Sequence, residues 1–150
     1  MTFDVVSLCW LLDNCPGLLA ANFAETGLPG RAFAPAREVY EVFDRSTPSF
    51  GVVARDDASR DLHVVGYAAV LIGPQLHTSD RIAQNDAVYV VPEFRGSGVG
   101  GRLFVEAERE AKRRGAGLFA WQVGKSSGFT KTLQRRTSPR KQQMIFFREL

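Results

Sequence analysis

A short glycine-rich run beside one arginine is the part of this sequence best suited to chemistry. It reads Arg-Gly-Ser-Gly-Val-Gly-Gly over residues 95–101 and follows an apolar stretch that stops at Pro92. Glycine lets the backbone turn tightly, with positive φ where other residues are strained. If a helix begins inside the run, its first N–H groups and the positive end of its dipole point to one place. The run therefore predicts a site for a phosphate-rich anion, with Arg95 as a charged donor.

Two common nucleotide sites fit this run poorly. Gly96, Gly98 and Gly101 match the spacing G-x-G-x-x-G, but a dinucleotide site also needs an acidic residue about 20 positions later. Residues 119–123, where it should lie, contain no acidic side chain. The glycines are followed by Arg102 rather than by Lys-Ser or Lys-Thr, so the run is not a nucleotide-hydrolysing P-loop.

The residues around the run predict a pair of parallel strands. A strand is expected at 87–91, an amphipathic helix at 99–114 and a buried strand at 118–123. A strand, a loop, a helix and a second strand in that order predict a right-handed crossover between parallel neighbours.

The rest of the chain predicts the remaining layers. Residues 50–54 and 62–72 are rich in β-forming side chains and predict a hairpin. Further strands are expected at 3–6 and 144–147, helices at 16–25, 35–43 and 129–133, and loops at 73–80 and 135–143. Asp13 or Asn14 is expected to cap the first of these helices. The second helix is expected to bury a stripe made of Val39, Tyr40, Val42 and Phe43.

Length and composition indicate one domain over residues 1–150. Hydrophobic residues make up 45% and charged residues 23%, which is ordinary for a globular protein. No apolar run is long enough to span a membrane, and the N-terminus lacks a basic secretory start. We therefore expect a soluble cytoplasmic protein with no membrane partner. Cys9, Cys15, His63 and His77 lack the spacing of metal ligands, so no structural zinc site is expected.

Charge is distributed unevenly along the chain. Residues 1–111 carry 9 Lys/Arg and 15 Asp/Glu, a net charge of −6, whereas residues 112–150 carry 10 Lys/Arg and 1 Asp/Glu, a net charge of +9. Such a division suggests an anionic partner for the C-terminal part. A phosphate-rich cofactor, a nucleic acid and a merely solvated surface all fit the pattern.

Residues 90–100, Val-Val-Pro-Glu-Phe-Arg-Gly-Ser-Gly-Val-Gly, resemble the acyl-CoA motif of the GNAT acetyltransferase superfamily. In that motif Arg/Gln-x-x-Gly-x-Gly/Ala binds the pyrophosphate, and residues 95–100 match it. The order of elements is similar over nearly the whole chain. The resemblance implies an α/β (α+β) fold, in which a mixed central sheet is flanked by helices and a splayed parallel strand pair holds acetyl-CoA or another acyl-CoA.

The resemblance also implies an activity. Similar proteins move an acetyl or other acyl group from acyl-CoA to a primary amine by direct attack in a ternary complex. Three alternatives stay open: a nucleic acid as the acceptor, a non-catalytic acyl-CoA-binding module, and an unrelated phosphate-binding α/β domain. Dimers are common among similar proteins, so a homodimer is one assembly that the resemblance implies.

The cofactor residues implied by the resemblance act largely through their main chain. The pyrophosphate would be held by Arg95, Gly96, Ser97, Gly98, Val99, Gly100 and Gly101. Val90 would pair with the pantetheine arm, and an N–H group of Val90 or Val91 would stabilise the oxyanion. The 3′-phosphate would lie near Lys125 or Lys131.

The acid and base carry over less directly. Many relatives place a glutamate early in the strand before the motif, where this chain has Asn85 and Asp86. Asp86 is the candidate base, directly or through water, if burial raises its pKa. Alternatively, both residues cap the loop before the strand. The tyrosine that many relatives use as general acid is missing between residues 126 and 143, where Ser126 or Ser127 could replace it.

Several further residues could line the acceptor or cofactor site. His77 and Tyr89 are candidates for acceptor binding, with an exposed histidine and core packing as the plain alternatives. Trp121 has the same two interpretations as Tyr89. A basic loop close to the cofactor is expected from Arg135, Arg136, Arg140 and Lys141.

Overall fold

The computed structural model describes residues 1–28, 30–58, 63–124, 127–137 and 148. Within them, five strands form one mixed sheet in the order β1-β2-β3-β4-β5. The strands are β1 (Thr2–Val6), β2 (Phe50–Arg55), β3 (Val64–Pro74), β4 (Arg81–Val90) and β5 (Ala116–Ala120). The helices are α1 (Leu8–Asn14), α2 (Pro16–Thr26), α3 (Arg37–Ser46), α4 (Val99–Arg113) and α5 (Gly128–Thr137), with a 3-10 turn, η1, at Pro92–Phe94.

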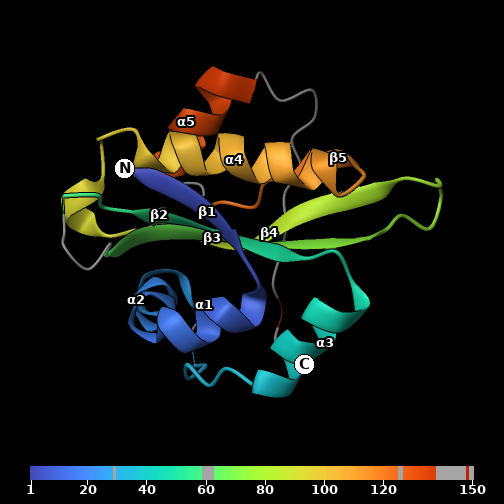
Figure 1. The fold of residues 1–150 in the computed structure, drawn as a ribbon, viewed down its shortest axis with the longest axis horizontal. Coiled ribbons are helices and arrows are strands. Elements are labelled where there is room, and N and C mark those ends of the chain that lie inside the picture. Colours follow the sequence, from blue (N-terminus) through green and yellow to red (C-terminus); the bar gives the residue numbers. More distant parts are fainter. Residues whose placement is uncertain (29, 59–62, 125–126, 138–147, 149–150) are drawn as a thin grey trace.

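The helices form a layer on each face of the sheet (Figure 1). Helices α1, α2 and α3 lie on one face, and α4 and α5 lie on the other. The first four strands are antiparallel to their neighbours, and β4 and β5 are parallel. The predicted mixed sheet, the hairpin of β2 and β3 and the crossover through α4 are therefore confirmed.

Both faces of the sheet carry a hydrophobic core. On the α4 side, Phe50 and Val52 pack with Leu103 and Ala107. On the α1–α3 side, Val53 packs with buried residues that include Tyr67 and Tyr89. Because both faces of β2 are covered, its residues from Phe50 to Ala54 are buried one after another rather than alternately.

The first helix, α1, was not expected from the sequence. Its N-cap is Ser7, whose Oγ accepts a hydrogen bond from the Trp10 N–H at 3.0 Å. The carboxylate of Asp44, from α3, accepts the N–H groups of Leu8 and Cys9, each at 2.9 Å. These acceptors satisfy the first turn of a helix too short to be recognised by its pattern.

The expected cap of the following helix was wrong because Asp13 and Asn14 form the last turn of α1. The residue at the N-terminal boundary of α2 is Cys15, whose side chain makes no capping hydrogen bond. Pro16 occupies the first turn as expected, where a missing N–H costs nothing.

The predicted buried stripe on α3 was wrong in part. Tyr40 and Phe43 pack against the core, whereas Val39 and Val42 are 51% and 50% exposed. Helix α3 contacts mainly α1 rather than the sheet, so only part of its apolar side is covered.

The end of the chain also differs from expectation. Helix α5 continues to Thr137, so residues 135–137 are helical rather than part of a loop. The strand predicted at 144–147 lies outside the described residues.

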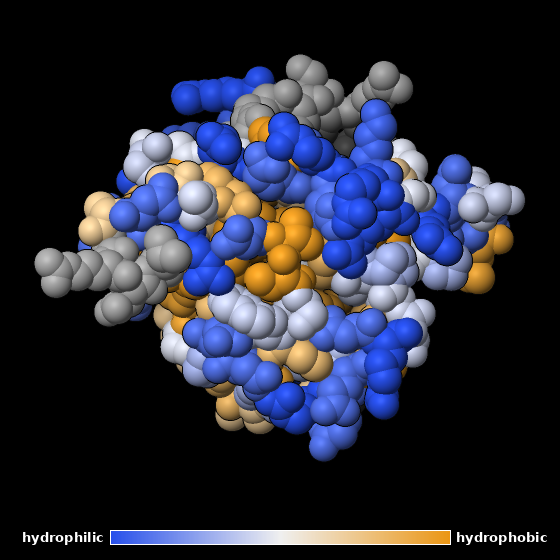
Figure 2. All heavy atoms as spheres, in the orientation of Figure 1, coloured by the Kyte–Doolittle hydropathy of each residue, from blue (hydrophilic) through white to orange (hydrophobic). Residues whose placement is uncertain are grey.

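Polar and charged side chains cover most of the face shown in Figure 2, and apolar side chains are visible mainly in the strip between the two helical layers. Val5 of the edge strand β1 is 46% exposed. Among the described helices, none is long and apolar enough to cross a membrane.

Candidate functional site

Strands β4 and β5 pair along only part of their length. Their pairing runs from Arg81 opposite Ala116 to Gln84 opposite Ala120. Strand β4 then continues to Val90, and over these residues it pairs only with β3 in the described part of the chain. We call the place where the two strands separate, after Gln84 and Ala120, the fork.

The side chain of Asn85 bridges the two strands at the fork. Its Nδ2 donates to the Gln122 carbonyl at 2.9 Å, and its Oδ1 accepts the Gln122 N–H at 2.6 Å. Asn85 is only 4% exposed. A primary amide carries the same donor and acceptor as a peptide unit, so this side chain takes the place of a further main-chain pair.

One extra residue in β4 lies immediately beyond the bridge. Ala69 is opposite Ala87 and Val70 is opposite Asn85, so Asp86 has no partner in β3 and forms a β-bulge. The bulge reverses the alternation of side chains along β4. Ala83 packs in the core on the α4 side, whereas Ala87 packs in the core on the α1–α3 side.

Asp86 lies on the α1–α3 side of the sheet, close to Tyr40 and Tyr67. Burial raises the pKa of both phenols, and the negative charge of Asp86 raises it further. The Asp86 side chain is exposed, and no hydrogen bond or ion pair joins it to another described residue. Water reaches the carboxylate, yet the protein around it displaces enough solvent to raise its pKa.

Asn85 and Asp86 therefore do not cap the loop before the strand, as the alternative interpretation held. Both lie inside β4, which begins at Arg81 rather than at residue 87. The turn between β3 and β4 is correspondingly shorter than the predicted 73–80 loop.

The glycine-rich run forms the turn that begins α4. Gly96 has φ of 79°, and Gly98, the residue at the N-terminal boundary of the helix, has φ of 91°. A Cβ at either position would have open space around it, so the left-handed backbone rather than crowding favours glycine. The Ser97 hydroxyl donates to the Phe94 carbonyl at 2.6 Å and holds the turn together.

The first turn of α4 provides the donors expected of an anion site. The first intrahelical bond joins the Arg102 N–H to the Gly98 carbonyl at 3.0 Å. The N–H groups of Val99 and Gly100 precede it and have no acceptor within the helix. They lie at the positive end of a helix of 15 residues.

The guanidinium of Arg95 faces α2 instead of extending over the glycine turn. Its Nη2 lies 2.7 and 3.0 Å from the two carboxylate oxygens of Glu25. Its Nε donates to the Val90 carbonyl at 2.8 Å, and its Cζ lies 5.3 Å from the centre of the Tyr89 ring. The charged end of Arg95 is therefore paired with Glu25, and a direct role of this side chain in anion binding stays a prediction.

The main chain at the end of β4 distinguishes the two N–H groups expected to stabilise an oxyanion. The Val91 N–H donates to the Val65 carbonyl on β3 at 2.9 Å, so it is not available to an oxyanion. In an antiparallel pair, successive residues direct their N–H groups alternately toward and away from the partner. The Val90 N–H therefore points away from β3, on the side where the fork opens.

A cluster of aromatic rings packs against the glycine turn. Phe129 of α5 packs across Gly100, where a Cβ would lie 2.5 Å from the Phe129 ring. The Phe104 ring lies 5.2 Å from that of Phe129 and 4.3 Å from that of Trp121. Trp121 donates its Nε1–H to Glu108 at 2.8 Å, which makes Trp121 part of the packing beside β5.

The remaining predicted residues are not brought to the fork. His77 is exposed in the turn at the opposite end of β4 from Val90, and Tyr89 is 5% exposed in the α1–α3 core. Lys131 is exposed on α5, and the Ser127 hydroxyl accepts the Phe129 N–H at 3.2 Å. Lys125, Ser126, Arg140 and Lys141 lie outside the described residues, as does the side chain of Arg136.

Two surface hollows lie elsewhere on the molecule. One of about 300 Å³ is lined by residues that include Ser7, Asp44 and Arg114. The other, of about 360 Å³, lies between α4 and β5 and includes Glu108 and Leu118. Neither includes Asp86, Val90 or the glycine turn, so the candidate site rests on the fork and not on either hollow.

Comparisons with known proteins agree with this geometry. A family model described as Acetyltransferase (GNAT) family matches residues 19–128. The chain is similar in fold to ribosomal-protein-alanine N-acetyltransferase from Brucella melitensis biovar Abortus 2308, with a TM-score of 0.69, 18% identity and 100% of both chains covered. No curated protein sequence matches significantly.

Two further solved structures are similar in fold. The aminoglycoside acetyltransferase meta-AAC0020 from an uncultured soil metagenomic sample has a TM-score of 0.73 and 14% identity, with 99% of this chain and 95% of that chain covered. AAC(6′)-Iy, solved with the bisubstrate analogue CoA-S-monomethyl-acetylneamine, has a TM-score of 0.72 and 17% identity, with 100% and 99% covered. At such identities the likeness shows a common fold.

Proposed function

The chain belongs to the acetyltransferase (GNAT) family, and from this premise we propose that it transfers an acetyl or other acyl group from acyl-CoA to a primary amine. The amine attacks the thioester carbonyl directly in a ternary complex. A C–N bond forms, the C–S bond breaks, and CoA leaves as its thiolate, which takes up a proton. One observation carries the proposal: the fork between β4 and β5 lies beside a glycine turn that begins a long helix.

The residues present fit acyl-CoA in two respects. The N–H groups of Val99 and Gly100 at the start of α4 suit a pyrophosphate, which needs donors and a positive dipole end. The main chain of β4 beyond Gln84 has no β5 partner. Apart from the Val90 carbonyl, which accepts the Arg95 Nε–H, its fork-side groups can therefore pair with the amide-containing pantetheine arm. Acyl-CoA, when bound, supplies the activated acyl group.

The proposed chemistry uses two groups on β4. The Val90 N–H donates a hydrogen bond to the acyl oxygen as negative charge develops on it. Asp86 accepts a proton from the attacking amine, directly or through water, and its raised pKa improves it as a base. The bulge places Asp86 on the α1–α3 side, so the amine would approach from that side of the sheet.

The first experiment is a calorimetric titration with acetyl-CoA and, separately, with CoA. Wild type is compared with Gly98→Trp, which forces a bulky residue into the left-handed turn, and with the matched control Gly17→Trp. Gly17 is an exposed glycine of α2 with nothing within 4 Å of a Cβ. We expect wild type and the control to bind both ligands, and Gly98→Trp to bind at least about tenfold more weakly, since each tenfold is about 1.4 kcal/mol.

Two results would contradict the proposal at this stage. One is an absence of affinity of wild type for either ligand. The other is a folded Gly98→Trp variant that binds as well as Gly17→Trp. The first result would remove acyl-CoA as a substrate, and the second would move its site away from the glycine turn.

A second stage identifies the acceptor by release of free thiol from acetyl-CoA. Small amines, amine-bearing peptides and a nucleic acid are tested as separate acceptors. Turnover with an amine supports the proposal, whereas turnover only with nucleic acid supports the alternative of a nucleic-acid-modifying enzyme. Binding of acetyl-CoA without turnover on any acceptor would instead favour a non-catalytic acyl-CoA-binding module.

A further inference from the structure

We propose that Asn85 is a positioning residue that fixes where β4 and β5 separate, and that it thereby prepares β4 to receive the pantetheine arm. This inference rests on the proposed function, because the arm is part of acyl-CoA. It replaces the sequence-based expectation that Asn85 takes part in acid–base chemistry.

The geometry of the bridge carries the inference. Main-chain pairing stops at Gln84, and the next residue along β4 uses its side chain in place of its backbone. The Asn85 amide donates to the Gln122 carbonyl at 2.9 Å and accepts the Gln122 N–H at 2.6 Å. The Asn85 side chain alone therefore satisfies both the N–H and the carbonyl of Gln122.

A side-chain bridge is longer than a main-chain pair. Directly paired strands lie about 4.7–4.9 Å apart. The carbon atoms of the Asn85 side chain are inserted between the two backbones at the bridge, so the strands must be farther apart there. The bridge therefore fixes the separation of β4 and β5 at Asn85. Without it, the strands could separate wherever their main-chain hydrogen bonds are weakest.

The bridge also keeps other donors available. Without Asn85, the Gln122 N–H and carbonyl would both lose the partner that satisfies them in the structure. They would tend to recover partners by drawing the main chain of β4 back toward β5. That closure would consume the very groups of β4, including the Val90 N–H, that the proposed mechanism assigns to acyl-CoA.

Asparagine suits this position through its hydrogen-bonding groups. An ionised aspartate has the same shape but is only an acceptor, so one of its oxygens would face the Gln122 carbonyl without a proton between them. Glutamine keeps both groups on a chain that is one methylene longer. These two substitutions change the bridge in different ways, and neither alters the glycine turn.

The test compares two ligands on Asn85→Asp. One is acetyl-CoA, and the other is the nucleotide portion of CoA without its pantetheine arm. We expect a loss of roughly tenfold or more in affinity for acetyl-CoA, the size of effect that follows from leaving buried polar groups unpaired. Affinity for the nucleotide portion should stay at the wild-type value, because the glycine turn is unchanged. Gly98→Trp should lose both ligands.

The matched control is Asn14→Asp. The exposed Asn14 side chain, at the end of α1 and remote from the fork, donates to the Trp10 carbonyl at 2.9 Å. It makes the same amide-to-acid change and should leave both affinities unaltered. If Asn85→Asp does not fold, Asn85→Gln is measured in its place, with the same expected separation of the two ligands.

Hydrogen exchange of the Gln122 N–H supplies a readout that does not depend on ligand. Asn85→Asp should speed its exchange, whereas the N–H groups of the paired segment at residues 118–120 should keep their protection. Unchanged exchange would overturn the bridge itself, even if wild type bound no CoA. Equal loss of both ligands, or full retention of acetyl-CoA binding, would overturn the positioning role. Absence of binding by wild type would instead count against the proposed function.

Discussion

At the scale of single residues, Asp86 lies beside the fork in surroundings that disfavour its ionised form. Its carboxylate has no ion-pair partner among the described residues, and the surrounding protein raises its pKa. A carboxylate that gains nothing from its neighbours does not stabilise the fold. Such a residue is typical of catalytic groups, whose environment suits proton transfer more than folding.

Replacing Asp86 with asparagine should have opposite effects on stability and activity. A carboxyl whose pKa is raised on folding binds protons more tightly in the folded state, so its ionisation destabilises the fold as pH rises. Asp86→Asn should therefore increase the free energy of unfolding at neutral pH, measured by urea denaturation. The gain should disappear when the pH falls below 3.8, the ordinary pKa of an aspartate side chain.

The same substitution should lower kcat by about 10²-fold or more, the usual contribution of a general base. Asp56→Asn is a suitable control, because Asp56 lies in the turn after β2 and should affect neither quantity in this way. A variant at Asp86 with wild-type kcat would remove Asp86 from the mechanism.

At the scale of elements, β4 shows why sequence patterns predicted part of the site and missed the rest. An apolar run followed by Pro92 is a local signal, and it marked the end of the strand correctly. The bulge at Asp86 shifts side-chain alternation by one residue, so no single period of two runs through the whole strand. The sequence therefore predicted only residues 87–91, after the shift.

Contacts between distant residues explain the other differences. The glycine turn and the parallel pair could be predicted because their signals lie within neighbouring residues. The first turn of α1 depends on Asp44, which lies 36 positions away from Leu8 in the sequence. The pairing of Arg95 with Glu25 likewise joins two segments that no local pattern connects.

The contact between α4 and α5 depends on the absence of a side chain at Gly100. A Cβ there would lie 2.5 Å from the Phe129 ring, so Gly100→Ala should force the ring aside and destabilise the protein by roughly 1–3 kcal/mol. In a Phe129→Ala background the clash is gone. The same Gly100→Ala change should then stabilise by about 0.5–1 kcal/mol, because alanine suits a helix better than glycine.

Urea denaturation of the four proteins in this cycle measures the two effects. A change of sign between the backgrounds supports the close approach of the helices. Equal effects of Gly100→Ala in both backgrounds would show that Phe129 does not crowd this position.

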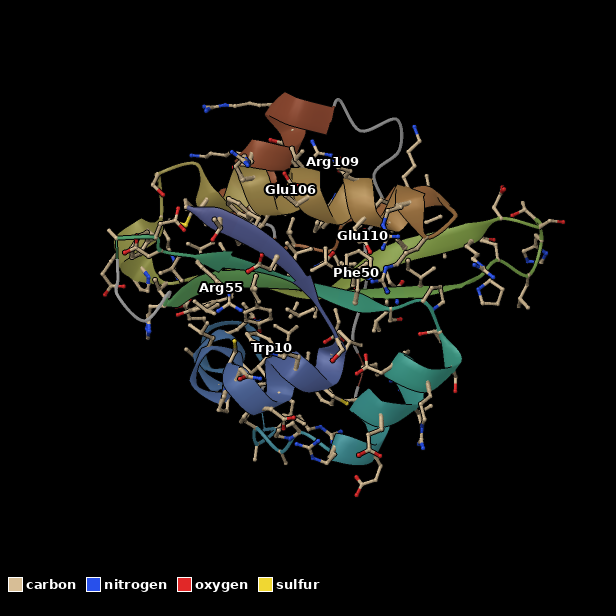
Figure 3. All side chains as sticks on the ribbon, in the orientation of Figure 1. Trp10, Phe50, Arg55, Glu106, Arg109 and Glu110 are labelled. Atoms are coloured by element: carbon tan, nitrogen blue, oxygen red, sulfur yellow. The ribbon has the colours of Figure 1, made fainter. Side chains whose placement is uncertain are left out.

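At the scale of the whole molecule, the acidic N-terminal part and the basic C-terminal part meet along α4. Glu106 and Arg109 form an ion pair at 2.7 Å on this helix, where Figure 3 labels both. Glu110 binds Arg113 and Arg114, each at 2.6 Å. Part of the C-terminal positive charge is therefore neutralised locally. Lys131 and Arg135 are exposed on α5, the helix that packs against the glycine turn.

This arrangement predicts that acetyl-CoA binding weakens with salt. Raising the salt concentration from about 50 mM to about 500 mM should raise Kd several-fold, because screening reduces attraction between the phosphates and nearby basic groups. Arg135→Ala should reduce this dependence, whereas Arg45→Ala, on α3 across the sheet, should leave it unchanged. A Kd that is independent of salt in wild type would assign the basic residues no part in cofactor binding.

The aromatic packing beside β5 has an optical consequence. The chain contains two tryptophans, Trp10 and Trp121. Trp10 lies under Arg55, 5.0 Å from its Cζ, on the α1 side of the sheet (Figure 3), and Trp121 packs on Phe104 on the α4 side. Trp121 directly precedes Gln122, whose main chain Asn85 binds. Trp121 therefore lies beside the fork, whereas Trp10 lies away from it. The molecule therefore contains its own fluorescent reporter for the fork and, on the opposite face, an internal reference for the same signal.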